Sequence, residues 1–375
     1  MKFVVSNTDL LNHLQTLSKV ISAKSQLPIL NDFLFTVQDQ TLGIRAADME
    51  TSMTTTVNLT SVESDGSVAI PAKFLLDLLS TTAVSDQPLT FDINDETFNI
   101  VIYSENGQYS FAGHNSVEFP KAVECGDDLE SFDIQPDAFL NAFSRTLFAT
   151  GEDEYRPVMS GILVELGECI TFVSSDAHRL VRYRYNPEPG DAPMQGSFII
   201  HKKPAGLLKN ILAKAEQPVH VSFNSKNAFF QVDDYTVSCR LIEGKFPNYN
   251  SVIPQNNPNI VTIDRLALIN SLTRVQVFSS RSISLVTLDI SENQMIIQAQ
   301  DTDYAASGKE VMKCQYEGDD LIIGFKSTFL IDILSNLTSA EVQIQLSDNA
   351  RPCIIVPAGE ENPEDVLMLL MPMKI

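Results

Sequence analysis

The sequence has few of the features that mark secreted, membrane or metal-binding proteins. Its five cysteines are odd in number and lie far apart among 375 residues, which argues against a disulfide framework and against a zinc site. No stretch approaches the roughly 18 consecutive apolar residues of a membrane span. The start, Met1 to Val5, lacks the apolar core and small-residue cleavage site of a signal peptide. We therefore expect a cytoplasmic protein with no membrane partner.

Familiar catalytic signatures are also missing. The sequence has no G-x-S-x-G, no G-x-x-x-x-G-K-[ST] and no H-E-x-x-H, and its five histidines are scattered. Asp301 and Asp303 offer two carboxylates to a divalent cation, but without an assembled ligand set a solvated turn is the better explanation. We expect no catalytic residue, no metal site and no cofactor.

Basic residues are scarce. The chain has 48 acids against 26 bases and a net charge of −22. Phosphate binding needs a basic surface, so the total charge argues against nucleic acid unless the bases are gathered in one place. Their distribution therefore has to be read against the organisation of the chain.

A helical pattern recurs three times at a constant spacing. It begins with Leu10, Leu11 and Leu14, with Asn7 or Thr8 as the expected cap. The step from Leu10 to Phe139 is 129 residues, and the step from Phe139 to Leu268 is again 129. Such a spacing indicates an internal repeat.

A second helix also recurs, each time after an apolar strand. Its copies begin near Phe74, Leu207 and Phe329. Strand-like alternation and turn signals fill the sequence between the helices. Each copy is therefore predicted to be an α+β domain with two helices on antiparallel strands. Polar, turn-prone segments place the domains at 1–127, 128–256 and 257–375.

The helices hold a large share of the bases. The six helical windows are 7–24, 70–83, 136–150, 202–214, 264–281 and 326–337, and they contain twelve bases and five acids. Helix propensity alone does not explain this excess, because glutamate also favours helices and is absent from all six windows. The pattern predicts a positive helical surface that attracts phosphates without reading bases.

The chain ends in an unusually apolar segment, Leu369 to Ile375. Chain ends are normally polar and solvated, so this segment must be held against the protein. It is either a buried final edge strand or part of a surface groove.

These features resemble the family of bacterial replicative sliding clamps, the beta subunit of DNA polymerase III. The resemblance spans the chain. Residues 175–180 read S-D-A-H-R-L, similar to the family's T-D-G-H-R-L; residues 244–249 read G-K-F-P-N-Y, similar to G-R-F-P-D-Y; and residues 371–375 read M-P-M-K-I, similar to M-P-M-R-L. The Met1-Lys2-Phe3 start and Leu27 to Leu30 also match.

The resemblance implies a DNA clamp fold with three tandem similar domains. Two copies would form a head-to-tail ring with helices lining the interior and antiparallel sheets outside. Such a ring encircles double-stranded DNA without sequence preference and makes the polymerase processive. The implied partners are the DNA polymerase III catalytic subunit, the clamp loader, repair polymerases and mismatch-repair proteins. The clamp itself is not an enzyme.

The resemblance also implies site residues. For DNA these are Lys24, Lys73, Arg156, Lys202 and Lys203. For the dimer interface they are Tyr109, Phe111, Val277 and Phe278. For a groove that accepts partner peptides they are Met159, Ser175, Ala177, His178, Arg179, Leu180, Pro247, Val252, Pro352, Leu369, Leu370, Met371, Pro372 and Met373.

The sequence departs from the family at a few positions. Ala177 replaces a glycine, Ser251 stands where some members have arginine, and Val158 stands where some have a DNA-contacting tyrosine. Residues 359–365 form an acidic extension. Two alternatives remain from the residues alone: a metal-dependent nucleic-acid-modifying enzyme using Asp301 and Asp303, and a scaffold protein with no role on DNA.

Overall fold

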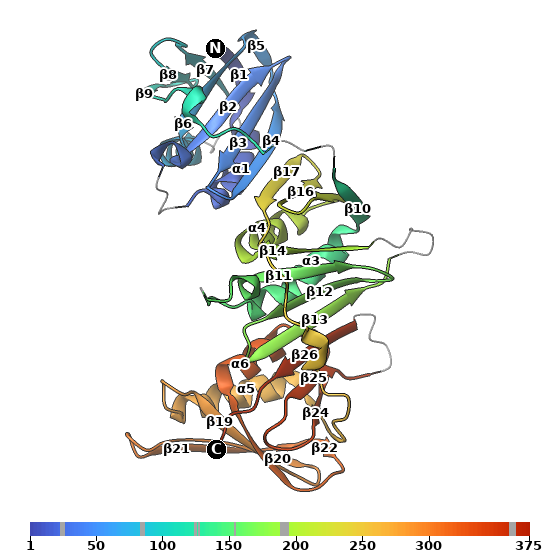
Figure 1. The fold of residues 1–375 in the computed structure, drawn as a ribbon. Coiled ribbons are helices and arrows are strands. Elements are labelled where there is room, and N and C mark those ends of the chain that lie inside the picture. The colour runs from blue at the N-terminus through green and yellow to red at the C-terminus, as the bar shows by residue number, and fades with distance from the viewer. Residues whose placement is uncertain are drawn as a thin grey trace. The chain divides into compact units, whose positions relative to one another are not determined.

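The computed structural model describes residues 1–22, 27–82, 87–123, 126, 128–153, 155–187, 195–359 and 365–375. By its packing the chain divides into two compact units. Unit 1 is Met1–Asp137 with Gly206–Leu241, and unit 2 is Ala138–Ala205 with Ile242–Ile375. Figure 1 labels the elements of both units.

The described residues contain six α-helices, and each lies inside one of the predicted windows. They are α1 (Asn7–Leu17), α2 (Ala72–Thr82), α3 (Pro136–Thr146), α4 (Lys202–Leu212), α5 (Arg265–Val275) and α6 (Ser327–Ser335). The cap predicted for α1 was wrong. It is Ser6, whose side chain accepts a hydrogen bond from the backbone N–H of Asp9 at 3.3 Å.

Unit 1 contains two sheets whose paired strands are antiparallel. The strand order of the five-stranded sheet is β5 (Ser61–Ser64), β1 (Lys2–Ser6), β7 (Pro88–Ile93), β8 (Asn99–Tyr103) and β9 (Gln108–Ala112). That of the eight-stranded sheet is β10 (Glu130–Ile134), β15 (Val219–Phe223), β16 (Asn227–Val232), β17 (Tyr235–Arg240), β4 (Thr51–Asn58), β3 (Thr41–Ala47), β2 (Asp32–Gln38) and β6 (Gly66–Pro71). The pairing of β4 with β17 joins the first and second copies of the repeat.

Unit 2 is built in the same way. The strand order of its nine-stranded sheet is β14 (Gly196–His201), β11 (Gly161–Leu166), β12 (Ile170–Ser175), β13 (Arg179–Tyr185), β26 (Asp365–Leu370), β25 (Cys353–Pro357), β24 (Glu341–Leu346), β18 (Asn259–Asp264) and β22 (Gln315–Tyr316). That of its four-stranded sheet is β21 (Ala306–Lys313), β20 (Gln294–Asp301), β19 (Leu285–Ser291) and β23 (Leu321–Lys326). The pairing of β13 with β26 joins the second and third copies.

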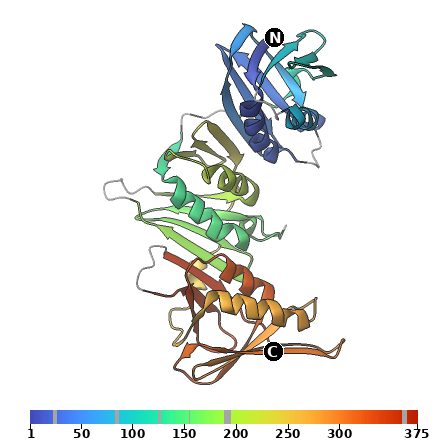
Figure 2. The same ribbon diagram turned by 180° about the vertical axis from the view of Figure 1, so that it is seen from behind.

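The element order confirms the threefold repeat and the α+β class. Each copy runs strand, helix, three strands, strand, helix, three strands, and the first and third copies add the short strands β5 and β22. Figure 2 shows α5 and α6, in orange and red-brown, side by side over strands of unit 2.

Clusters of phenylalanine fill the cores beneath the helices. In unit 1 the ring centroids of Phe3 and Phe91 lie 4.9 Å apart, and both side chains are buried. In unit 2 the centroids of Phe139 and Phe143 lie 4.4 Å apart, and both rings contact Phe172. Phe139 and Phe143, the apolar positions of α3, thus face the core.

Candidate peptide groove and nucleic-acid surface

The turn between β12 and β13 is held by its own polar side chains. One carboxylate oxygen of Asp176 accepts hydrogen bonds from the backbone N–H groups of His178 and Arg179, both at 2.9 Å. The hydroxyl of Ser175 donates to the carbonyl of Arg179 at 2.8 Å and accepts from the N–H of Ala177. Ala177 has a φ of +74°, a left-handed conformation that glycine adopts without steric cost. This is the position where the related family motif has glycine.

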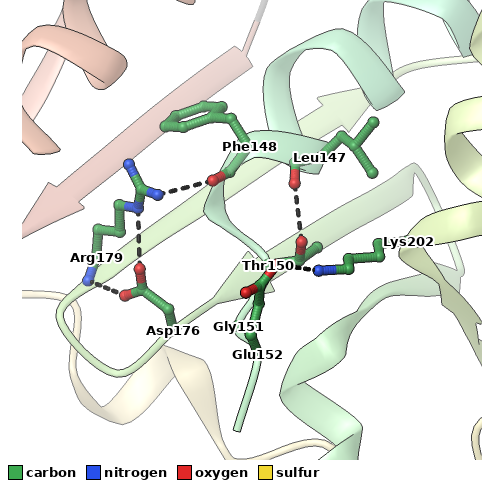
Figure 3. A pocket seen from close by; sticks show the side chains of 8 residues that line it. All are labelled: Leu147, Phe148, Thr150, Gly151, Glu152, Asp176, Arg179 and Lys202. Atoms are coloured by element: carbon green, nitrogen blue, oxygen red, sulfur yellow. Dashed lines mark hydrogen bonds and ion pairs between the residues drawn. The ribbon is translucent and has the colours of Figure 1, made fainter. Parts of the chain in front are cut away.

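Arg179 connects this turn to two other elements of unit 2. Its guanidinium donates to the carboxylate of Asp176 at 3.0 Å, to that of Asp332 in α6 at 2.7 Å and to the carbonyl of Phe148 at 2.8 Å. The central carbon (Cζ) of its guanidinium also lies 5.1 Å from the ring centroid of Phe148 and 4.4 Å from that of Phe329. Figure 3 shows Arg179 between Asp176 and Phe148. Arg179 is buried, so its main role here is to hold the turn in place.

The strands after this turn form an apolar floor. Leu180 lies opposite Leu369, and Leu369 lies opposite Ile354 on its other side. These three side chains belong to one buried cluster, whose remaining members are Leu163, Val173, Ile199, Phe246, Tyr249 and Ile253. Leu180 and Leu369 are only 3% exposed, so they would form the base of a groove and not its rim. Leu370 is the next residue along the strand and points to the opposite face.

The other residues predicted for the groove differ in their exposure. Val252 is 50% exposed and Met371 is 38% exposed. The remaining ones are Pro247, Ala177 and His178, which are exposed, and Met159, Pro352, Pro372 and Met373, which are half-buried. The apolar cluster itself contains residues of the second and third copies of the repeat.

Backbone hydrogen bonds hold the tail at two points. The N–H of Met371 donates to the carbonyl of His178 at 2.8 Å, and the N–H of Met373 donates to the carbonyl of Gly324 in β23 at 2.8 Å. The preceding strand β26 lies between β13 and β25. The tail is therefore the continuation of an interior strand, and the edge-strand alternative was wrong.

The sequence prediction missed several residues beneath the groove. Val158 packs against the apolar cluster, and Phe246, Tyr249, Ile253 and Ile354 belong to it. The continuous apolar run of β25, from Cys353 to Val356, was a usable signal for Ile354. The hydroxyl of Tyr249 donates to the carboxylate of Glu165. The pKa of Tyr249 is raised to about 12, mainly by burial and next by the nearby Glu165 carboxylate.

The bases predicted to contact DNA have different surroundings. Lys73 is exposed at the start of α2 in unit 1, whereas Lys24 lies outside the described residues. In unit 2, Arg156 is exposed and pairs with Asp153 at 2.8 Å, and Lys203 is half-buried in the first turn of α4. Lys202 is bonded to Glu152, and this hydrogen bond and charge lower the pKa of Glu152.

Lys202 and Glu152 line an open pocket with Arg179 and Asp176. Its volume is about 450 Å³, and its other lining residues are Leu147, Phe148, Thr150 and Gly151. Figure 3 shows that Lys202 and Arg179 approach this pocket from separate elements. The start of α4 therefore lies close to the turn that borders the apolar floor.

Not every helical base is available to a ligand. Arg145 is 6% exposed and donates to the carbonyl of Asn336 at 2.6 Å and to the hydroxyl of Thr338 at 3.0 Å. Arg274 makes two hydrogen bonds of 2.6 Å to the carboxylate of Glu310. Fewer basic side chains are therefore available to a positive surface than the twelve counted in the helical windows.

The residues predicted for a dimer interface lie at two sheet edges, each in its own unit. Tyr109 and Phe111 belong to β9, which ends the five-stranded sheet, and the Phe111 ring lies 5.4 Å from that of Phe74. Val277 and Phe278 follow α5 beside β21, which ends the four-stranded sheet. Val277 is 76% exposed and Phe278 is 40% exposed.

Asp301 ends β20, and Asp303 lies in the turn that follows it. Asp301 accepts hydrogen bonds from the backbone N–H groups of Asp303 at 3.0 Å and Tyr304 at 3.4 Å. Asp176 likewise accepts from the residues two and three positions after it. Among the residues that the structure describes, no three His, Cys, Asp or Glu side chains are grouped closely enough to hold a metal ion. In the same part of the chain, no helix is long and apolar enough to cross a membrane.

Comparison with protein families gives three consecutive matches. Residues 1–123 match the N-terminal domain of the DNA polymerase III beta subunit, residues 133–248 its central domain and residues 250–374 its C-terminal domain. Among curated proteins, the chain is 26% identical to the beta sliding clamp of Haemophilus influenzae over 369 residues, covering 98% of this chain and 99% of the relative. It is 25% identical to that of Pseudomonas putida, with both chains covered completely.

Solved structures show the same fold. The DNA polymerase III beta subunit of Pseudomonas aeruginosa matches with a TM-score of 0.93 at 24% identity, and both chains are covered completely. A second crystal structure of that protein, with the same TM-score, contains griselimycin. The beta subunit of Thermotoga maritima matches with a TM-score of 0.90 at 25% identity, covering 100% of this chain and 99% of the relative.

Proposed function

Because the chain belongs to the family of the bacterial DNA polymerase III beta subunit, we propose that it acts as a sliding clamp. Two copies form a head-to-tail ring around duplex DNA and tether the replicative polymerase to its template. The observation that carries this proposal is the match of all three domains, in order, along nearly the whole chain. The clamp is a processivity factor and not itself an enzyme. It works in the cytoplasm. Its three domains are residues 1–127, 128–256 and 257–375.

Ring closure uses the two terminal sheet edges. β9 and β21 each have one neighbour within the sheets of the described chain. They belong to the first and third copies, so the β9 edge of one protomer pairs with the β21 edge of its partner. Tyr109 and Phe111 then meet the partner's Val277 and Phe278. Head-to-tail contacts close only when the rotation between copies allows it, and in this proposal the ring closes at two copies.

DNA is held by topology and weak phosphate contacts. Lys73, Arg156, Lys202 and Lys203 face the duplex inside the ring, and Lys24, which lies outside the described residues, remains a predicted DNA contact. The six helical windows hold five of the 48 acids, and the acids elsewhere discourage DNA from binding outside the ring. Contacts of this kind weaken as salt rises, because bound phosphates release counterions.

Partner proteins dock at the apolar cluster of unit 2. The floor of Leu180, Leu369 and Ile354 receives apolar anchors of a short peptide, while exposed Val252 and Met371 form part of the rim. A few such anchors in a desolvated site supply most of the affinity in peptide recognition. The DNA polymerase III catalytic subunit, the clamp loader, repair polymerases and mismatch-repair proteins share this groove in turn.

The test is retention on DNA of different topology. The protein is loaded onto nicked circular DNA by the clamp loader of the same organism, and the circles are then cut once. We expect the protein to remain on the circles and to leave the linear duplex through its ends. Replacing Lys73, Lys202 and Lys203 with Glu should impair loading while the dimer persists. Equal retention on circular and linear DNA would contradict the proposal, and DNA turnover with magnesium would favour an enzyme.

A further inference from the structure

A second pocket lies in unit 1, at the junction of the first and second copies of the repeat. Its volume is about 340 Å³. It is built on the turn between β3 and β4, where Asp48 accepts hydrogen bonds from the backbone N–H groups of Glu50 at 2.8 Å and Thr51 at 2.7 Å. Asp176 holds the turn beside the apolar floor of unit 2 by the same two bonds. The two turns are repeat equivalents.

The strands beneath the two sites correspond as well. Ser52 lies four residues after Asp48 in unit 1, and Leu180 lies four residues after Asp176 in unit 2. Ser52 lies opposite Ser238 on β17, just as Leu180 lies opposite Leu369 on β26. The segments that cross the two sites also match, because Phe119-Pro120 corresponds to Phe246-Pro247. The unit 1 pocket therefore has the backbone frame of the proposed groove.

The chemistry of the two floors is opposite. Leu180 and Leu369 are replaced by Ser52 and Ser238, whose hydroxyl oxygens lie 3.4 Å apart. Three residues before the turn aspartate, Val173 of unit 2 is replaced by Arg45. An apolar anchor gains little from such a floor, because burying hydroxyls and a guanidinium against it costs free energy.

The lining of the unit 1 pocket is net basic in a chain with a net charge of −22. Arg45, Lys121, Lys226 and Arg240 line it together with two acids, Asp48 and Glu50. One oxygen of Asp48 is already engaged by the turn.

Arg45 is fixed within this lining. Its guanidinium lies 5.0 Å from the centroid of the Phe119 ring and donates to the carbonyl of Pro120. Its Nε is buried and has no hydrogen-bond partner among the described residues. The pocket thus presents positive charge on a rigid frame.

We propose that this pocket binds a short acidic peptide segment of a partner protein. The inference rests on the proposed function, since it adds a second docking site to a clamp that recruits partners. A peptide fits better than a nucleic acid, because the pocket combines basic side chains with exposed apolar ones. The rim also carries apolar side chains, Met49 at 68% and Val123 at 47% exposure, which suit a mixed acidic and apolar peptide.

The experiment measures fluorescence anisotropy of labelled octapeptides with the full-length protein. The acidic probe carries four glutamates and one leucine, and its matched control carries glutamines in their place. An apolar probe with two leucines and one phenylalanine reports on the groove of unit 2. The variant Lys121→Glu with Lys226→Glu reverses two exposed charges of the pocket. The control Arg351→Glu reverses the repeat equivalent of Lys226 at the other junction.

We expect the acidic probe to bind the wild type at low salt and the glutamine probe to bind at least tenfold more weakly. The double variant should lose at least tenfold in affinity for the acidic probe and keep its affinity for the apolar probe. Arg351→Glu should leave the acidic probe unaffected. An unchanged affinity in the double variant, displacement of the acidic probe by the apolar one, or equal binding of an eight-nucleotide single strand would each overturn the proposal. Absence of apolar-probe binding alone would count against the unit 2 groove and not against this pocket.

Discussion

Arg179 is the residue that most clearly joins separate elements beside the proposed groove. It pairs with Asp176 three residues earlier and with Asp332 in α6. The same spacing occurs at the surface, where Arg156 pairs with Asp153. The arginine side chains are 9% and 48% exposed respectively. Burial should therefore make the first arginine important for stability and the second nearly neutral.

We predict that Arg179→Met lowers the free energy of unfolding by about 2–3 kcal/mol, because it removes charged hydrogen bonds from a buried site. Arg156→Met is the matched control and should change it by less than about 0.5 kcal/mol. Urea unfolding followed by circular dichroism measures both, since the chain contains no tryptophan. Equal effects of the two substitutions would mean that the buried network adds nothing beyond a surface pair.

Tyr249 gives a second prediction at this scale. Its pKa is raised to about 12 in the folded protein, against about 10 in an unfolded chain. Above pH 10 the unfolded chain loses the proton first, so this contribution to stability is complete below pH 10 and disappears as the pH approaches 12.

With Tyr249→Phe, the free energy of unfolding should therefore decrease less steeply between pH 10 and 12. The difference in slope should be at most about 1.4 kcal/mol per pH unit. Urea unfolding of wild type and variant at pH 8, 10 and 11 measures the difference in slope. The other tyrosines and the lysines titrate in both proteins and cancel in the comparison. Parallel curves would show that Tyr249 ionises alike in both states.

At the scale of elements, the tail combines two roles. Strand β26 is an interior strand that carries Leu369 into the apolar cluster. Beyond it, Met371 and Met373 are each held by one backbone hydrogen bond. The strand belongs to the fold, whereas the last residues lie at the border of the proposed groove.

We predict that deletion of residues 371–375 costs about 1–3 kcal/mol, the net value of two backbone hydrogen bonds, and leaves the dimer intact. Binding of an apolar peptide should fall at least tenfold, because part of the rim is lost. Deletion of 374–375 alone is the control, since it keeps both hydrogen bonds. Melting temperature and peptide anisotropy on the same samples separate the two effects. A large loss of stability with unchanged peptide binding would refute the groove assignment.

At the scale of the whole molecule, the proposed assembly depends on the two sheet edges β9 and β21. An exposed edge strand is a ready surface for pairing with another chain. Phe278 packs against Gly308 of β21, where an added Cβ would lie 2.5 Å from its ring. Phe278 therefore also supports its own edge, and Val277 is the more exposed of the two residues.

Val277→Glu should convert the dimer of about twice 41.5 kDa into monomers, because a carboxylate buried in an apolar contact is costly. Val117→Glu is the control, since Val117 is 86% exposed and lies outside both edges. Sedimentation velocity over a range of concentrations measures the mass. An unchanged dimer would place the interface elsewhere.

The sequence alone determined the repeat, the six helices and the α+β class. These follow from periodicity and spacing, which depend on neighbours along the chain. The position of a cap was less certain, because Ser6, Asn7 and Thr8 are all capable caps and only the backbone geometry selects Ser6. The motif around Asp176 also indicated a turn, because its hydrogen bonds are local.

Only the tertiary structure decided what lies around that turn. Arg179 meets Asp332 across 153 residues of sequence, and Leu180 meets Leu369 because β13 pairs with β26. Likewise, the sequence showed Arg145 as one more helical base, and its burial against Asn336 became visible only in the fold. Strand pairing between distant segments depends on the register of whole sheets, which no local pattern records. The same reason kept the basic pocket hidden: Ser52 and Ser238 become neighbours only when β4 pairs with β17.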